Sequence, residues 1–165
     1  MGSHHYGRRM EHERSGSVTR DIAADPMTVW AAISDITRMG EWSPECHTCE
    51  WQEGHDRPVV GARFDGHNRN GDKEWSTHAE IDRCEPGVAF HFKAMIGRSD
   101  FHFANWRYDL EAIDGGTRVT ESWDDLRPEE SLARSKEISG VGDRRVHNNE
   151  TASTTLERLA AALER

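Results

Sequence analysis

The chain has 165 residues, a formal net charge of −9 and a mean hydropathy of −0.87, which fits one domain with a substantial core. The acidic balance argues against a nucleic-acid-binding protein, which normally presents a basic face. No apolar run approaches the roughly 20 residues of a membrane-spanning helix, and the N-terminus lacks the apolar centre of a signal peptide. We therefore expect a cytoplasmic protein without nucleic-acid or integral-membrane partners.

The N-terminal residues are polar, basic and without hydrophobic periodicity. We predict a disordered tail over 1–16, with an expression-vector remnant as an alternative origin for part of it. The histidines of this tail, His4, His5 and His12, therefore carry no functional weight. The remaining residues, 17–165, are predicted to form a single ligand-binding domain.

Residues 17–24 alternate in character and predict a short strand. A short amphipathic helix is expected next, because Asp25 is a typical N-cap and Pro26 suits the first helical position. Apolar residues then recur at helical spacing until Gly40 and Pro44 break the pattern. The predicted domain therefore begins with a strand that is followed by helical structure.

Between residues 45 and 127 the polarity alternates with a period of two. Six short runs end at glycine- or proline-containing turns, which is typical of an antiparallel meander. The six predicted strands cover residues 46–51, 61–69, 74–84, 88–95, 103–113 and 117–126. Together with the first strand they make seven.

The chain ends in a predicted helix of about twenty residues that begins at Asp143. Its apolar stripe consists of Ala152, Leu156, Leu159 and Leu163, with Asn149 on the N-terminal extension of that stripe. A long helix can cover one face of a curved antiparallel sheet, which gives a two-layer α+β fold. The space between the layers is a natural ligand pocket. The preceding segment, 127–142, is predicted to be either a helix or a mobile cover over the pocket mouth.

The order of these elements resembles the SRPBCC, or START-like, superfamily, and within it the polyketide cyclase/dehydrase-type members. The strings that carry the resemblance are DPMTVWAAISDI…GEWSPE, VGARFDGHNRNG, EWSTHAEIDRCEPG, NWRYDLEAIDGGTRVTESWD and TTLERLAAALE. The resemblance implies a helix-grip fold, in which a seven-stranded curved antiparallel sheet wraps around the C-terminal helix and short helices follow the first strand. It also implies a hydrophobic cavity that binds lipids, polyketides, hormones or other aromatic or steroid-like molecules. Because the superfamily contains both enzymes and carriers, it defines the fold better than the activity.

Strand alternation predicts which side chains face the space between sheet and helix. Trp106 and Tyr108 share one face of their strand, and Glu121 shares a face with apolar neighbours on the next strand. The residues predicted to contact a ligand are Trp42, His47, Phe64, Asn68, Trp75, Thr77, Trp106, Tyr108, Glu121, Trp123 and Asn149. Aromatic stripes of this kind also fill ordinary cores. The polar Asn68 and Glu121 distinguish the two interpretations, unless they merely satisfy each other or Tyr108.

Three functions are compatible with this pattern. The first is a protein that binds a small hydrophobic molecule without catalysing a reaction. The second is a cyclase, dehydratase or hydrolase in which Glu121 acts as the base and Tyr108 or Asn68 as the donor, with His47 as another titratable group. The third is a dimeric regulatory or stress protein. We expect no cofactor, and a monomer or a homodimer.

Cys46 and Cys49 form a C-x-x-C pattern within a predicted strand. Residues three apart in a strand point to opposite faces, about 10 Å apart at Cα, whereas a disulfide tolerates at most about 7 Å. A second pair of metal ligands at matching spacing is missing from the sequence. We therefore expect neither a metal site nor a redox pair, unless a bulge intervenes. His47, Cys49 and Trp51 are predicted to face inward.

Overall fold

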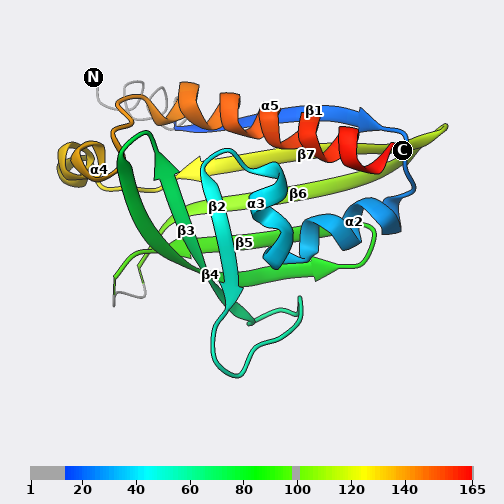
Figure 1. Ribbon diagram of the computed structural model, residues 1–165, viewed down its shortest axis with the longest axis horizontal. Helices are drawn as coiled ribbons and strands as arrows, with labels where there is room; N and C mark the ends of the chain where they lie inside the picture. The colour runs from blue at the N-terminus through cyan, green and yellow to red at the C-terminus, as the bar shows by residue number, and fades with distance from the viewer. Residues whose placement is uncertain (1–13, 98–100, 165) are drawn as a thin grey trace, which may run out of the picture.

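In the computed structural model, which describes residues 14–97 and 101–164, a long helix lies across one face of a curved seven-stranded sheet (Figure 1). The strands are β1 (Ser15–Ile22), β2 (Cys46–Trp51), β3 (Arg63–Asn70), β4 (Lys73–Glu85), β5 (Ala89–Met95), β6 (His102–Ile113) and β7 (Gly116–Asp125). The helices are α2 (Pro26–Ser34), α3 (Met39–Trp42), α4 (Leu132–Ser139) and α5 (Arg144–Leu163), with short 3-10 helices η1 (Ile36–Arg38) and η2 (Glu129–Ser131). The predicted α+β helix-grip architecture is confirmed.

All neighbouring strands run antiparallel, in the order β1-β7-β6-β5-β4-β3-β2. Strands β2 to β7 follow one another as the predicted meander. Two of its tight turns use Gly71 and Gly115, whose φ angles of +60° and +79° favour glycine. The first strand, β1, pairs with the last, β7, at the edge of the sheet. It begins at Ser15 rather than at residue 17, and residues 1–13 of the predicted tail lie outside the described residues.

The helices gather on one face of the sheet, where α5 crosses β1 and β7 and α2 and α3 lie beside it (Figure 1). Leu156 and Leu159 of the predicted stripe are fully buried. Asp143 caps α5 by accepting two backbone N–H bonds, and Asp25 caps α2 ahead of Pro26, as predicted. None of the helices in the described ranges is long and apolar enough to cross a membrane.

The register between β6 and β7 sets the polar centre of the concave face. Tyr108 lies directly opposite Glu121, and Trp106 lies opposite Trp123. Tyr108, Glu121 and Trp123 are buried, so the inward side of both strands is the predicted one. Because directly opposed residues are close neighbours, this register brings a phenol and a carboxyl together.

Segment 127–142 contains η2 and α4, which agrees with the helical alternative for this region. Helix α4 ends at Gly140, whose φ of +71° is a left-handed C-cap. The Asn70 side chain of β3 donates a hydrogen bond of 2.8 Å to the Ser139 carbonyl oxygen. This bond holds α4 beside the turn between β3 and β4, at one end of the concave face.

Candidate functional site

A cavity of about 590 Å³ lies between the concave face of the sheet and helices α4 and α5. Pockets that hold small molecules commonly measure about 300–1,000 Å³. Seven of the eleven residues predicted to contact a ligand line this cavity: Phe64, Asn68, Trp75, Thr77, Trp106, Tyr108 and Glu121. They come from β3, β4, β6 and β7, where uninterrupted alternation turns every second side chain inward.

The other four predicted contact residues do not line the cavity, which corrects the prediction. Trp123 is buried beneath α5, and its ring N–H donates to Asn149 Oδ1 at 3.3 Å. Trp42 belongs to the core under the guanidinium of Arg38, which lies 4.7 Å from the ring centroid. His47 is exposed to solvent. The hydrogen bond between Trp123 and Asn149 and the packing of Trp42 in the core explain why these three side chains lie outside the cavity. An irregularity in β2 explains the position of His47.

Helix α5 contributes a second, polar stripe to the cavity, which the sequence analysis missed. Its members are Arg144, Asn148, Thr151 and Thr155. They are spaced by four, three and four residues, as one face of a helix requires. The buried amide is therefore that of Asn148, not Asn149. The helical spacing of this polar stripe can be read from the sequence. The prediction instead extended the neighbouring apolar stripe toward the N-terminus and therefore chose Asn149 in place of Asn148.

Tyr108 and Glu121 form a buried hydrogen-bonded pair in the cavity wall. The Tyr108 hydroxyl donates to Glu121 Oε1 at 3.0 Å, while Oε2 is buried and has no hydrogen-bond partner within the described ranges. Burial raises the pKa of Glu121 to about 8, although the bond from Tyr108 opposes the rise. Burial, followed by the charge of Glu121, also raises the pKa of Tyr108. Glu121 consequently keeps its proton at neutral pH and can donate it from the unpaired oxygen.

Strand β2 contains a bulge at its start. The register with β3 shifts between Cys46 and Thr48, so His47 is the extra residue. Both Cys46 and Cys49 line the cavity, and their Sγ atoms are 3.0 Å apart. The prediction that the two cysteines point to opposite faces is therefore wrong, because one extra residue reverses the alternation on one side of it. The same shift turns His47 out of the cavity.

Glu45, just before β2, connects this wall to the start of α5. It accepts hydrogen bonds from Arg144 at 2.6 Å and from His147 at 3.1 Å. Burial opposes ionisation, but the bond from His147 and the charge of Arg144 outweigh it and lower the pKa of Glu45. The Arg144 guanidinium also lies 5.5 Å from the ring centroid of Trp75. Glu45 and Arg144 both line the cavity and were not predicted.

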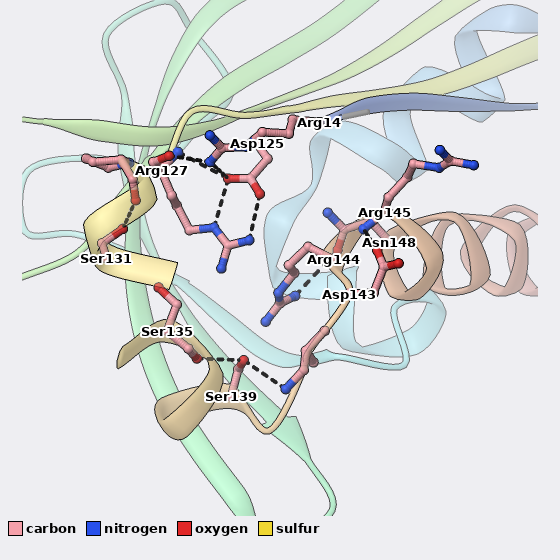
Figure 2. Close-up of polar contacts among 12 residues, drawn as sticks. Arg14, Asp125, Arg127, Ser131, Ser135, Ser139, Asp143, Arg144, Arg145 and Asn148 are labelled. Atoms are coloured by element: carbon pink, nitrogen blue, oxygen red, sulfur yellow. Dashed lines mark hydrogen bonds and ion pairs between the residues drawn. The ribbon is translucent and has the colours of Figure 1, made fainter. Parts of the chain in front are cut away.

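A second arginine approaches the same space from the end of β7. Arg127 donates to both carboxylate oxygens of Asp125, at 2.8 Å and 2.6 Å. Figure 2 shows Arg127 and Arg144 extending toward the region between α4 and the start of α5. Ser131 of η2 and Ser135 of α4 line the cavity there as well. This end of the cavity is therefore polar, whereas the sheet supplies mostly apolar walls.

Removing the Glu45 carboxylate by Glu45→Ala should destabilise the fold by about 2–4 kcal/mol, because it leaves Arg144 largely buried without its partner. Urea unfolding monitored by circular dichroism measures the change. Glu41→Ala is the matched control, since its ion pair with Arg38 is exposed and should contribute less than about 1 kcal/mol. Equal losses in the two variants would contradict the structural role of Glu45.

No group of three His, Cys, Asp or Glu side chains in the described part of the chain is placed to hold a metal ion. The polar groups of the cavity instead suit hydrogen bonding to an organic molecule. A phenol–carboxyl pair lies in the sheet wall, and amide, hydroxyl and guanidinium groups lie toward α4 and α5.

Residues 13–164 match the family described as polyketide cyclase/dehydrase and lipid transport. None of the proteins with curated functions matches the chain. The solution structure of Cgl2372 from Corynebacterium glutamicum, a polyketide cyclase-like protein, is 34% identical, with a TM-score of 0.60 over 91% of each chain.

Two more distant structures share the fold. The di-domain ARO/CYC protein StfQ of the steffimycin biosynthetic pathway is 13% identical, with a TM-score of 0.72 over 95% of this chain and 53% of its own. The Aha1 dimer from Colwellia psychrerythraea is 16% identical, with a TM-score of 0.62 over 91% of this chain and 96% of its own. At these identities the likeness concerns the fold alone.

Proposed function

The chain belongs to the polyketide cyclase/dehydrase and lipid transport family, and on this premise we propose that it binds a small hydrophobic molecule in the cavity between the sheet and α5. The observation that carries the proposal is an open cavity of about 590 Å³, in whose wall a buried carboxyl oxygen has no hydrogen-bond partner among the residues that the structure describes. In an ordinary packed core, interdigitating side chains fill such a space, and buried polar atoms have partners.

The chemistry of the walls narrows the ligand class to lipid-, polyketide- or aromatic-type molecules with a few oxygens. Phe64, Trp75 and Trp106 offer flat apolar surfaces. Protonated Glu121 offers a hydrogen-bond donor that suits a carbonyl or ether oxygen. Asn68 lies on the wall nearer β2, where its amide donates to the Thr77 hydroxyl at 3.4 Å. Polar contacts on two walls would orient an elongated ligand.

Native mass spectrometry of the purified protein, followed by solvent extraction, tests for a bound hydrophobic molecule. The anionic aromatic dye 1-anilinonaphthalene-8-sulfonate provides a defined probe of the emptied cavity. We expect Ala94→Trp to weaken dye binding by about tenfold or more, because Ala94 lines the cavity and the indole would occupy it. Ala112→Trp, at an exposed position of β6, is the matched control and should bind the dye normally. Unchanged binding by Ala94→Trp would contradict the cavity as the binding site.

A second candidate function is proton transfer on a polyketide-type substrate, as in a cyclase or dehydratase. The pKa of about 8 favours it, because Glu121 could then exchange a proton near neutral pH. At pH 7, however, only about one tenth of such a group is ionised and able to act as a base. The Tyr108 hydroxyl already donates its hydrogen bond to Glu121, so it would have to reorient before stabilising an enolate. The geometry therefore supports binding more directly than catalysis.

Glu121→Gln separates the two functions once a bound molecule has been identified. Glutamine keeps the shape of the side chain and a hydrogen-bond donor, but it cannot transfer a proton near neutral pH. If Glu121 is the base, turnover falls by about 10²-fold or more while affinity changes little. Turnover that survives the substitution would show that the base assignment is wrong. Binding by both proteins without turnover by either would support a carrier.

A further inference from the structure

The bulge in β2 places two thiols together on the cavity wall. Cys46 and Cys49 Sγ are 3.0 Å apart, and Met39 Sδ lies 3.6 Å from Cys49 Sγ. The backbone of Gly66 lies beneath the pair, and a Cβ added there would approach Cys46 Sγ to 3.3 Å. Since a regular strand would separate these side chains, the juxtaposition depends on the single extra residue, His47.

The sulfur separation distinguishes two uses of a thiol pair. Two thiolates on one tetrahedral zinc ion lie about 3.8 Å apart, because each Zn–S bond is about 2.3 Å long. The observed 3.0 Å is shorter, and no third His, Cys, Asp or Glu ligand completes a site across residues 14–97 and 101–164. The spacing fits a thiol hydrogen-bonded to a neighbouring sulfur, which is the arrangement that precedes disulfide formation.

We propose that Cys46 and Cys49 form a reactive dithiol pair that reduces a low-molecular-weight disulfide entering the cavity and closes to an internal disulfide. Cys46 is the attacking sulfur. It is the more exposed of the two, whereas Cys49 is buried behind it. The resulting disulfide would lie in the wall of the cavity, and the exchange requires only that a small disulfide can enter that cavity.

The immediate surroundings of the sulfurs support this division of roles. The hydrogen bond from Cys49, aided by backbone N–H groups of Thr48 and His67, lowers the pKa of Cys46 although burial and the charge of Glu45 oppose it. The same hydrogen bond, followed by burial, raises the pKa of Cys49. The thiolate therefore forms at Cys46, and Cys49 keeps its proton until the second step.

The exchange proceeds in two balanced steps. The Cys46 thiolate attacks one sulfur of the disulfide RS–SR, which forms Cys46–S–SR and releases RS⁻. The released thiolate takes the Cys49 proton, and the Cys49 sulfur then attacks Cys46 and expels the second RS⁻, which is protonated by water. Two protein thiols are oxidised to one disulfide, and one external disulfide is reduced to two thiols. The third cysteine, Cys84, is not part of this pair, and its thiol donates a hydrogen bond to the Pro58 carbonyl oxygen at 3.3 Å, which favours the protonated, less reactive form.

Oxidised glutathione is the probe for the test, applied to the full chain near neutral pH and followed by intact mass and peptide mapping. The wild-type protein should lose two hydrogens and retain no glutathione. Cys49→Ser should stop at a mixed disulfide on Cys46, and Cys46→Ser should lose the fast reaction. Cys84→Ser should behave as the wild-type protein. We expect Cys46 to react about tenfold or more faster than Cys84, whose thiol pKa is raised by burial.

Two controls keep the result interpretable. Circular dichroism checks that each variant is folded, and guanidinium-unfolded protein should lose the difference between Cys46 and Cys84. The relative rates of Cys46 and Cys84 within folded wild-type protein need no variant at all. Equal rates there would overturn the proposal, and so would stable glutathione adducts on both Cys46 and Cys49. Exchange without dye binding would instead reject the proposed ligand function and leave the dithiol pair standing.

Discussion

Glu121→Gln should stabilise the folded protein by roughly 3–4 kcal/mol more at pH 8.5 than at pH 5, relative to the wild-type protein. The reason is the pKa of Glu121, which burial raises to about 8 from a usual value of 4.5. The unfolded chain releases this proton as the pH passes 4.5, whereas the folded chain holds it until about pH 8. Folding therefore takes up a proton between these values and becomes less favourable as the pH rises, by about 1.4 kcal/mol per unit.

Urea unfolding of both proteins at several pH values measures this difference. The gap should be small near pH 5, widen through pH 8 and level off above it, because both states of the wild-type protein are then ionised. Glu157→Gln, at an exposed position of α5, is the control and should show no such widening. A gap that narrows with rising pH would mean that folding lowers, rather than raises, the pKa of Glu121.

Local alternation was sufficient to predict the polar centre of the site. Strands β6 and β7 keep an unbroken register from Ala104 to Ile113, so the period of two places Tyr108 and Glu121 on the inward side. No local pattern could say that these two residues are cross-strand neighbours. That follows from the length of the turn at Gly115, which sets the register of the hairpin.

The parts of the site that the sequence analysis missed depend on irregularity or on distance along the chain. The bulge at His47 is marked by neither glycine nor proline, so alternation carried straight through it and placed Cys46 on the wrong face. Glu45 and Arg144 are 99 residues apart, and only the packing of α5 against the start of β2 brings them together. The alternation of residues within one strand or helix carries no information about a contact between residues so far apart in the chain.

Gly40→Ala should destabilise the fold by about 3 kcal/mol or more, opposite in sign to the usual effect in a helix. In most helices alanine is favoured over glycine by about 1 kcal/mol. Gly40 of α3, however, packs directly on the bulge, and a Cβ there would lie 2.1 Å from the carbonyl oxygen of His47. A backbone carbonyl cannot rotate away as a side chain would, so either α3 or the bulge must move.

Thermal and urea unfolding measure the loss of stability, and the rate of oxidation by oxidised glutathione reports on the geometry. If the bulge moves, the sulfurs of Cys46 and Cys49 separate, and Gly40→Ala should form the internal disulfide more slowly than the wild-type protein. Gly142→Ala is the matched control, because a Cβ there would make only an ordinary 3.6 Å contact with the flexible Lys136 side chain. It should change stability by less than about 1 kcal/mol. A Gly40→Ala protein as stable and as readily oxidised as Gly142→Ala would show that α3 does not hold the bulge in place.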